Sequence, residues 1–170
     1  LKAKDPETVT VFIGPCMAKK SEAADKSIEG NADYVLTFGE AIELMGAKDV
    51  KLEPEEYADQ EGSVFGKRFG NGGGVTNAVI QCLKEQGQNT DIKVAKCSGP
   101  ADVKKALLLM KVGRLPEDFI EGMMCQGGCV GGPSNLKQEV VWKKDRDALI
   151  AKADGRGVWE NLKNYDMDSF

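Results

Sequence analysis

Three cysteines stand in two loops whose composition suits an inorganic cluster. Cys16 follows an apolar, β-branched stretch that ends at Gly14-Pro15, and Cys125 and Cys129 lie in a second loop that is dense in glycine. Glycines let backbone N–H groups approach an anionic sulfide cluster and supply the positive φ angles that wrapping requires. Cysteine-rich loops without histidine suit iron–sulfur clusters, which take thiolate ligands. The two loops therefore predict an iron–sulfur site.

The first loop, residues 14–22, also places a cation near its cysteine. A strand is expected to end, and a helix to begin, at Cys16. Such a position at the carboxyl edge of a parallel sheet is typical of α/β functional sites, and a helix N-terminus favours a thiolate. Lys19 is expected one helical turn beyond Cys16 on the same face. Lys20 is expected to point about 100° away, into solvent.

Each loop also has a purely structural interpretation. Taken alone, Cys16 is more typical of a small core residue beside a solvated face. The second loop, residues 121–135, is compatible with a tight turn closed by a strained disulfide. That interpretation explains neither the glycine density nor the first loop, so the pair of loops favours the cluster.

The composition excludes several kinds of chemistry. The 170 residues contain no histidine, which removes Ser-His-Asp triads, Cys-His dyads and histidine-ligated zinc. The 23 Lys and Arg are scattered among 27 Asp and Glu, which argues against a nucleic-acid-binding surface. No apolar run approaches the roughly 20 residues of a membrane span. Five cysteines without a secretory signal favour a reducing, cytoplasmic setting. The first residues, without an initiator Met or an apolar signal segment, are expected to lie inside a longer protein.

Strand-like and helix-like segments alternate along the chain. Strands are expected at residues 8–13, 34–37, 91–97 and 119–124. Helices are expected at residues 39–45, 75–86 and 101–112, with a short helix within 53–61 and a helical segment from about 136 to 170 anchored by Trp142 and Trp159. This alternation predicts an α/β fold with a mainly parallel sheet and helices on both faces. Cys82 and Cys97 are expected in the core.

The motifs resemble the catalytic domain of the [FeFe]-hydrogenases, that is, the C-terminal domain of the iron-only hydrogenase large subunit. Residues 15–22 resemble the family's second signature, Pro-Cys-x-x-Lys-x-x-Glu. Residues 121–132 resemble its third, Glu-x-Met-x-Cys-x-x-Gly-Cys-x-x-Gly, and residues 69–75 resemble the glycine-rich helix start between them. Residues 33–37 also fit. The resemblance covers nearly the whole chain, which is therefore expected to form the C-terminal part, residues 1–170, of such a domain.

The resemblance implies a resident H-cluster, in which a [4Fe–4S] cluster is joined to a diiron unit that carries CO, cyanide and a dithiolate bridge. Three residues match its thiolate ligands: Cys16, Cys125 and Cys129. Cys129 matches the thiolate that bridges to the diiron unit. Lys19 is expected to donate to a cyanide, and Met123 to pack against the diiron unit. Glu22 either holds Lys19 or belongs to a proton path. The implied protein is an anaerobic oxidoreductase that interconverts H2 with protons and electrons, or a sensor of H2.

The chain also departs from the family. The first signature, Thr-Ser-Cys-Cys-Pro, which supplies the fourth ligand and a proton-relay cysteine, is absent from this sequence. These residues alone are therefore expected to be metal-free and inactive without the N-terminal part of the domain. Gly14, Met124 and residues 131–135 replace the usual Met, Ala and Gly-Gly-Gly-x-Pro, which is similar to divergent, sensory members. Electrons are expected from a ferredoxin or from further iron–sulfur domains of the same chain.

Two other functions stay open. A hydrogenase-like scaffold or adaptor of cytosolic iron–sulfur assembly shares the cysteine pattern without hydrogen chemistry. Lys19 and Met123 discriminate between this scaffold and a hydrogenase, because they serve the diiron unit and have no evident role around a cubane alone. A metal-free interaction module in a signalling protein leaves both loops unexplained and ranks last.

Overall fold

The computed structural model describes residues 2, 4–51, 62–136, 139–153 and 155–163, with the side chains of residues 139–142 left out. The described residues fall into two compact units. The first holds the described residues up to 51 together with 132–136, and the second holds residues 62–131 and those from 139 onward. The short helix expected within 53–61 and the side chain of Trp142 lie outside the described residues.

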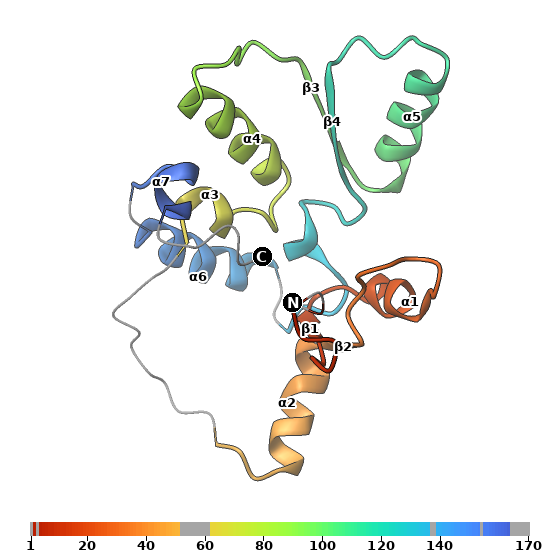
Figure 1. The fold of residues 1–170 in the computed structure, drawn as a ribbon, viewed down its shortest axis with the longest axis vertical. Coiled ribbons are helices and arrows are strands. Elements are labelled where there is room, and N and C mark those ends of the chain that lie inside the picture. The colour runs from red at the N-terminus through yellow and green to blue at the C-terminus, as the bar shows by residue number, and fades with distance from the viewer. Residues whose placement is uncertain (1, 3, 52–61, 137–138, 154, 164–170) are drawn as a thin grey trace. The chain divides into compact units, whose positions relative to one another are not determined.

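The first unit is a β-α-β-α segment, drawn in red to orange in Figure 1. Its elements are β1 (Val11–Gly14), α1 (Ala18–Ala24), β2 (Tyr34–Thr37) and α2 (Phe38–Ala47). The two strands pair in parallel, with Gly14 opposite Thr37 at their carboxyl ends. Both strands were expected, and the first is shorter than predicted. The helix α2 runs through Gly46 to Ala47, beyond the end expected at residue 45.

A capping box decides where α2 begins. The Thr37 side chain accepts from the backbone N–H of Glu40, and the Glu40 carboxylate accepts from the backbone N–H of Thr37 at 2.8 Å. Two backbone donors that a helix start leaves unpaired are thereby satisfied. Because Thr37 is also the last residue of β2, strand and helix join without a loop.

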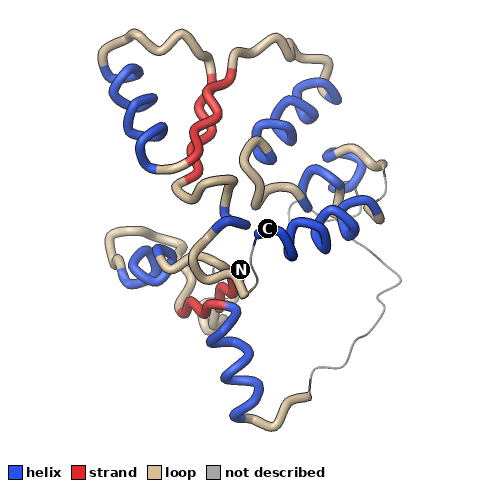
Figure 2. The backbone as a smooth tube through the Cα atoms, turned by 180° about the vertical axis from the view of Figure 1, so that it is seen from behind, coloured by secondary structure: helices blue, strands red, loops and turns tan. Residues whose placement is uncertain are grey.

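The second unit contains the remaining elements, which Figure 2 shows from behind. They are α3 (Val64–Lys67), α4 (Gly74–Glu85), β3 (Val94–Ser98), α5 (Pro100–Lys111), β4 (Phe119–Met123), the 3₁₀ turn η1 (Cys129–Gly131), α6 (Glu139–Ala151) and α7 (Val158–Leu162). The strands β3 and β4 pair in parallel, and α5 is the crossover between them. α4 and α5 flank this strand pair in Figures 1 and 2. α3 was not expected, because its residues show no helical periodicity.

The α/β class with parallel strands is confirmed, but the described strands do not form one sheet. They form two separate two-stranded sheets, β1–β2 in the first unit and β3–β4 in the second. A sheet of two strands buries little apolar surface on its own. Among the described residues the buried apolar side chains are accordingly few, and all but one of them are small: Ala41, Ala78, Cys97, Ala106 and Ile150. The sizeable core that the composition allows is not present within the described residues.

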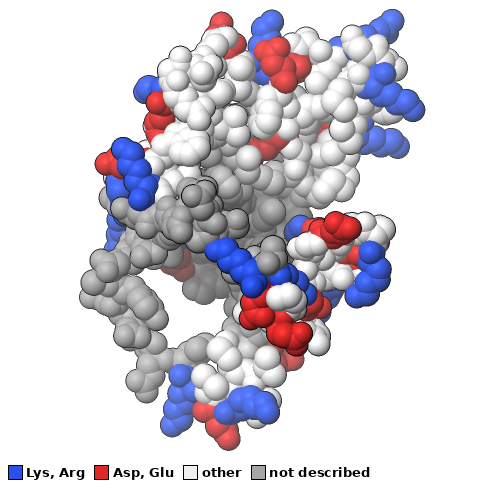
Figure 3. Space-filling model, in the orientation of Figure 1, with Lys and Arg blue, Asp and Glu red and all other residues white. Residues whose placement is uncertain are grey.

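Several large apolar side chains remain exposed. They include Val11 and Ile13 on β1 and Leu107 and Leu108 on α5, each close to half exposed. Charged residues of both signs are interspersed over the face visible in Figure 3. No helix among the described residues combines the length and apolar character needed to cross a bilayer.

The C-terminal helix α7 is attached to α4 through one carboxylate. Glu85, the last residue of α4, accepts the backbone N–H groups of Val158 and Trp159 at 2.9 and 2.8 Å. Burial pushes the pKa of Glu85 upward, but these bonds and one from Gln81 outweigh it, and the pKa is lowered. The predicted anchor Trp159 is 40% exposed, so its ring is only partly packed. The two bonds to Glu85 therefore contribute to the attachment of this helix at its N-terminus.

Candidate functional site

Cys16 lies in the connection between β1 and α1. The helix begins at Ala18 with Met17 as its N-cap, so Cys16 precedes the helix instead of opening it. The expectation that Cys16 and Lys19 share one helix face is therefore wrong. Pro15 and Cys16 are partly buried, and Gly14 is buried at the end of β1. Cys16 thus sits at the carboxyl end of a parallel strand, as the sequence predicted.

Gly14 stands where the resemblance expects a methionine, and the local packing suits a glycine. A Cβ at this position would lie 2.8 Å from the ring of Phe12. Phe12 is 39% exposed and its ring edge therefore has room to turn. A larger residue at position 14 requires that movement.

Lys19 is held by its own helix. Its ammonium lies 2.7 Å from both carboxylate oxygens of Glu22, and the two side chains are 42% and 43% exposed. Both line a cavity of about 150 Å³ together with Phe12 and Asn31. Of the two roles considered for Glu22, holding Lys19 is the one its geometry performs. An ammonium has three N–H donors, and the carboxylate accepts two of them.

Lys20 is not simply solvated, which corrects the expectation for this residue. Its ammonium lies 2.5 Å from the Glu40 carboxylate, so α1 and α2 are joined by an ion pair. Hydrogen bonding to Lys20, then to the backbone and side chain of Thr37, lowers the pKa of Glu40 from 4.5 to about 2. The pattern of residue types gave no signal for this pair, because Glu40 is 20 positions away.

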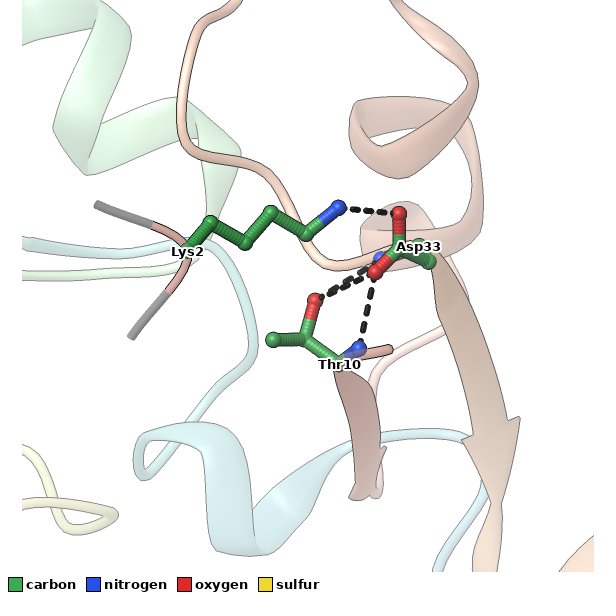
Figure 4. Close-up of polar contacts among 3 residues, drawn as sticks. All are labelled: Lys2, Thr10 and Asp33. Carbon is green, nitrogen blue, oxygen red and sulfur yellow. Dashed lines mark hydrogen bonds and ion pairs between the residues drawn. The ribbon is translucent and has the colours of Figure 1, made fainter. Parts of the chain in front are cut away.

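Asp33, just before β2, collects three donors, as Figure 4 shows. Its carboxylate accepts from the Lys2 ammonium and from the backbone N–H and hydroxyl of Thr10, the latter two at 2.7 and 2.9 Å. The bond from Lys2, followed by those from Thr10, holds the pKa of Asp33 well below its usual range. The residues before β1 are thereby tied to the start of β2.

Cys125 and Cys129 follow β4 in the second unit. Met123 is the last residue of the strand, Cys125 is partly buried two residues later, and Cys129 begins the turn η1 with its side chain exposed. None of the five cysteines forms a disulfide, so the strained-disulfide interpretation finds no support. Within either unit, the described residues include no group of three Cys, Asp or Glu side chains arranged to hold a metal ion.

The glycines of this loop have a specific steric reason. A Cβ at Gly128 would lie 2.4 Å from the Gly70 carbonyl oxygen, and a Cβ at Gly131 would lie 2.2 Å from that of Gln126. Gly127 and Gly128 also have positive φ angles of 78° and 101°. The positive φ angles are those that the sequence predicted, and the glycines permit a close approach of backbone to backbone. The predicted approach of backbone N–H groups to a cluster stays a prediction. The neighbour that these glycines approach is a second glycine-rich loop of the same unit.

That neighbour, residues 69–74, is hydrogen bonded directly to the cysteine loop. The Gly72 N–H donates to the Gly127 carbonyl at 2.9 Å, and the Val130 N–H donates to the Gly70 carbonyl at 3.0 Å. We call this arrangement, residues 69–74 against residues 125–131, the interlocked loops. A cavity of about 270 Å³ beside them is lined by Met123, Glu121, Cys97 and Lys96, among others. Cys97 is buried, which raises the pKa of its thiol, as expected of a core residue.

The six predicted site residues thus fall into two groups. Cys16, Lys19 and Glu22 lie together in the first unit, and Met123, Cys125 and Cys129 lie together in the second. That the two groups meet at one cluster stays a prediction. The sequence patterns did not identify the contacts of Glu121. Its carboxylate accepts from the Gly73 N–H and the Thr76 hydroxyl, which lie 45 or more positions away in the sequence.

Comparison with known proteins decides the family. The family model described as "Iron only hydrogenase large subunit, C-terminal domain" matches residues 1–133. The chain belongs to this family. It is 30% identical to Iron hydrogenase 1 of Clostridium pasteurianum, over 88% of this chain and 33% of that protein. It is 31% identical to the periplasmic [Fe] hydrogenase large subunit of Nitratidesulfovibrio vulgaris, over 84% of this chain and 42% of that protein.

The relatives of this hydrogenase-family chain are not all hydrogenases. It is also 24% identical to a probable cytosolic Fe-S cluster assembly factor, oxy-4 of Caenorhabditis elegans, over 91% of this chain and 41% of that protein. The chain therefore spans between 33% and 42% of the length of these curated relatives. A solved [FeFe]-hydrogenase, HydA(deltaEFG), has the same fold, with a TM-score of 0.57 at 20% identity over 94% of this chain and 56% of that one.

Proposed function

We propose that this chain is the part of an [FeFe]-hydrogenase catalytic domain that holds the H-cluster, and that the full-length protein interconverts H2 with protons and electrons or senses H2. The observation that carries the proposal is the cysteine loop. Met123, Cys125 and Cys129 follow one another at the end of β4, in a loop packed backbone to backbone on a second glycine-rich loop. A metal-free module has no need of thiols in such a loop.

The donor set fits an iron–sulfur cofactor. The sequence offers cysteine thiolates and no histidine, and thiolates are the ligands that these clusters take. In this proposal Cys16, Cys125 and Cys129 hold the [4Fe–4S] cluster, and Cys129, the exposed one of the three, also faces the diiron unit. When bound, the H-cluster supplies the redox-active metals at which H2 is formed or cleaved. The fourth thiolate and the proton-relay cysteine come from another part of the protein.

The remaining site residues act around the cluster. Glu22 holds Lys19 with its charge in place, which leaves one ammonium N–H to donate to an anionic ligand. Met123 lines the cavity beside the interlocked loops and supplies an apolar, polarisable contact. A ferredoxin, or additional iron–sulfur domains of the same protein, delivers the electrons. We propose a cytoplasmic location, which the name of the oxy-4 relative supports and that of the periplasmic relative does not.

A second candidate function is an iron–sulfur scaffold or adaptor. The similarity to an Fe-S cluster assembly factor favours it, and so does the exposed Lys19–Glu22 pair, which forms without any diiron unit. The two candidates differ in one property. A hydrogenase accepts a diiron unit after its cubane is formed, whereas an adaptor stops at the cubane.

The test uses the full-length protein under anaerobic conditions. The protein is first loaded with iron and sulfide and then incubated with a synthetic diiron dithiolate complex that carries CO and cyanide. We expect protein-bound CO and cyanide bands in the infrared spectrum after gel filtration, together with H2 turnover or an H2-dependent spectral change. Cubane formation without diiron uptake would assign the protein to the adaptors, and absence of any bound iron would overturn both candidates.

A further inference from the structure

A carboxylate of the cysteine loop's own strand has no assigned role. Glu121 lies on β4, two residues before Met123, and it is only 5% exposed. A buried carboxylate is costly unless hydrogen bonds satisfy it. Its partners therefore indicate what the side chain does.

Both partners of Glu121 belong to the start of α4. The carboxylate accepts from the backbone N–H of Gly73 at 3.0 Å and from the hydroxyl of Thr76, which is fully buried. Gly73 is the N-cap of the helix, with a φ of 84°, and as a glycine it has no side chain that could cap its own helix. Glu121 instead satisfies the N–H of the N-cap residue itself, from a strand 48 positions away. A negative group at this end also complements the helix dipole.

The same bond reaches the interlocked loops. Gly73 is adjacent to Gly72, whose N–H donates to the Gly127 carbonyl between the two cysteines of the loop. The Gly70 carbonyl accepts from the Val130 N–H just after Cys129. The glycine-rich loop therefore contacts the cysteine loop on both sides of residue 128. At Gly73 the same loop is also hydrogen bonded to Glu121 on β4.

We propose that Glu121 is a positioning residue that acts through the glycine-rich loop. By fixing the start of α4 against β4, it sets the conformation of residues 125–131 and hence the spacing of the Cys125 and Cys129 thiols. This inference rests on the proposed function for its purpose, since the thiols need fixed spacing to hold a cluster. It assigns no proton transfer to Glu121, because both carboxylate oxygens accept hydrogen bonds that stay within the fold.

Substitutions separate positioning from proton transfer. Glu121→Gln keeps an acceptor for the Gly73 N–H, and the Thr76 hydroxyl can accept from the new amide instead of donating. Glu121→Met keeps the length of the side chain and removes both bonds. At the other end, Thr76→Val removes the hydroxyl at nearly constant shape, and Thr76→Ser retains it. If Glu121 relayed protons, both Glu121 variants would lose proton transfer. If it positions the loop, glutamine restores the wild-type loop conformation and methionine does not.

The first readout needs no cluster. In the full-length apo protein, amide hydrogen exchange across residues 127–131 reports local opening of the loop. We expect Glu121→Met to speed exchange there by roughly tenfold or more, and Thr76→Val by a smaller factor, because bonds to a charged group are lost. Glu121→Gln and Thr76→Ser should stay within about twofold of the wild type. Alkylation of Cys125 by iodoacetamide should rise in parallel with exchange.

The second readout is iron and sulfide content after reconstitution. We expect the order wild type, Glu121→Gln, Thr76→Val, Glu121→Met, from highest to lowest. If Glu121→Met fails to fold, the Thr76→Val and Thr76→Ser pair carries the test alone. Unchanged exchange at residues 127–131 in Glu121→Met or Thr76→Val would overturn the inference, and so would a glutamine variant as impaired as the methionine one. A wild-type protein that binds no iron, while exchange still responds to Glu121, would sink the proposed function and leave the positioning role standing.

Discussion

The ammonium of Lys19 lies 2.7 Å from both carboxylate oxygens of Glu22, one helical turn further along α1. This ion pair holds the Lys19 ammonium against its own helix, three positions after Cys16 in the sequence, without any contribution from a cofactor. Each of the two side chains is also more than two fifths exposed. An ion pair this exposed adds little to stability, so a role of Lys19 in ligand binding can be tested separately from folding.

Lys19→Ala in the full-length protein should impair diiron uptake or turnover and leave folding nearly unchanged. Because exposed pairs contribute about 1 kcal/mol or less, melting should shift by a few degrees at most. Cubane content, from iron and sulfide analysis, should match the wild type. Lys26→Ala, an exposed lysine just beyond α1, is the control and should change neither property. Full diiron occupancy and activity in Lys19→Ala would contradict the proposed role.

The ion pair between Lys20 and Glu40 should appear in the acid stability of the protein. The pKa of Glu40 is lowered from 4.5 to about 2, so its charged form favours the folded state. The resulting stabilisation is fully present above about pH 4.5 and is lost as the pH falls toward 2. The difference in unfolding free energy between the wild type and Glu40→Gln, measured with urea, should therefore shrink as the pH falls through this window.

Lys20→Ala is the matched partner in that experiment. Removing the largest cause of the lowered pKa should move the acid loss of stability to higher pH, while the bonds from Thr37 keep part of the effect. An acid limb identical in the wild type and Lys20→Ala would show that this pair does not form in solution.

The sequence predicted the elements that short-range patterns determine. Residues 34–37 form β2 with the expected bounds, because β-branched and aromatic residues there precede a helix with a capping residue. The helices predicted at residues 39–45, 75–86 and 101–112 formed with ends shifted by one or two residues. Cys16 was misplaced, since no side chain caps the start of α1 and nothing in the local pattern marks its first residue.

Contacts between distant residues were beyond sequence patterns. Glu121 was identified as part of a motif, yet its partners Gly73 and Thr76 lie at the start of a helix, 45 or more positions away. The division of the strands into two pairs was likewise not predicted, because alternation of strands and helices specifies parallel pairing without specifying which strands pair. The ion pair between Lys20 and Glu40 was also not predicted, because a loop and a strand separate the two residues in the sequence.

Two neighbouring glycines of the cysteine loop should differ sharply when replaced by alanine. Gly127→Ala meets nothing within 4 Å and is disfavoured only by its positive φ, at about 1–2 kcal/mol. Gly128→Ala is also disfavoured by a positive φ and in addition clashes with the Gly70 carbonyl, which adds about 1–3 kcal/mol or displaces the loop. Urea unfolding measures the difference. Equal losses in the two variants would argue against the interlocked loops.

Replacing each cysteine in turn should separate ligands from core residues. In the reconstituted full-length protein, Cys16→Ser, Cys125→Ser and Cys129→Ser should each lower iron and sulfide content, because serine oxygen is a poorer ligand for iron–sulfur clusters than thiolate. Cys82→Ala and Cys97→Ala should keep the iron. Burial raises the pKa of both of these thiols, so they should also be the slowest to react with iodoacetamide in the apo protein. Cys97 is 7% exposed, so Cys97→Ala should lower stability by about 1 kcal/mol through lost packing alone. Iron loss in Cys97→Ala as large as in Cys125→Ser, at unchanged secondary structure, would reassign the ligands and with them the site.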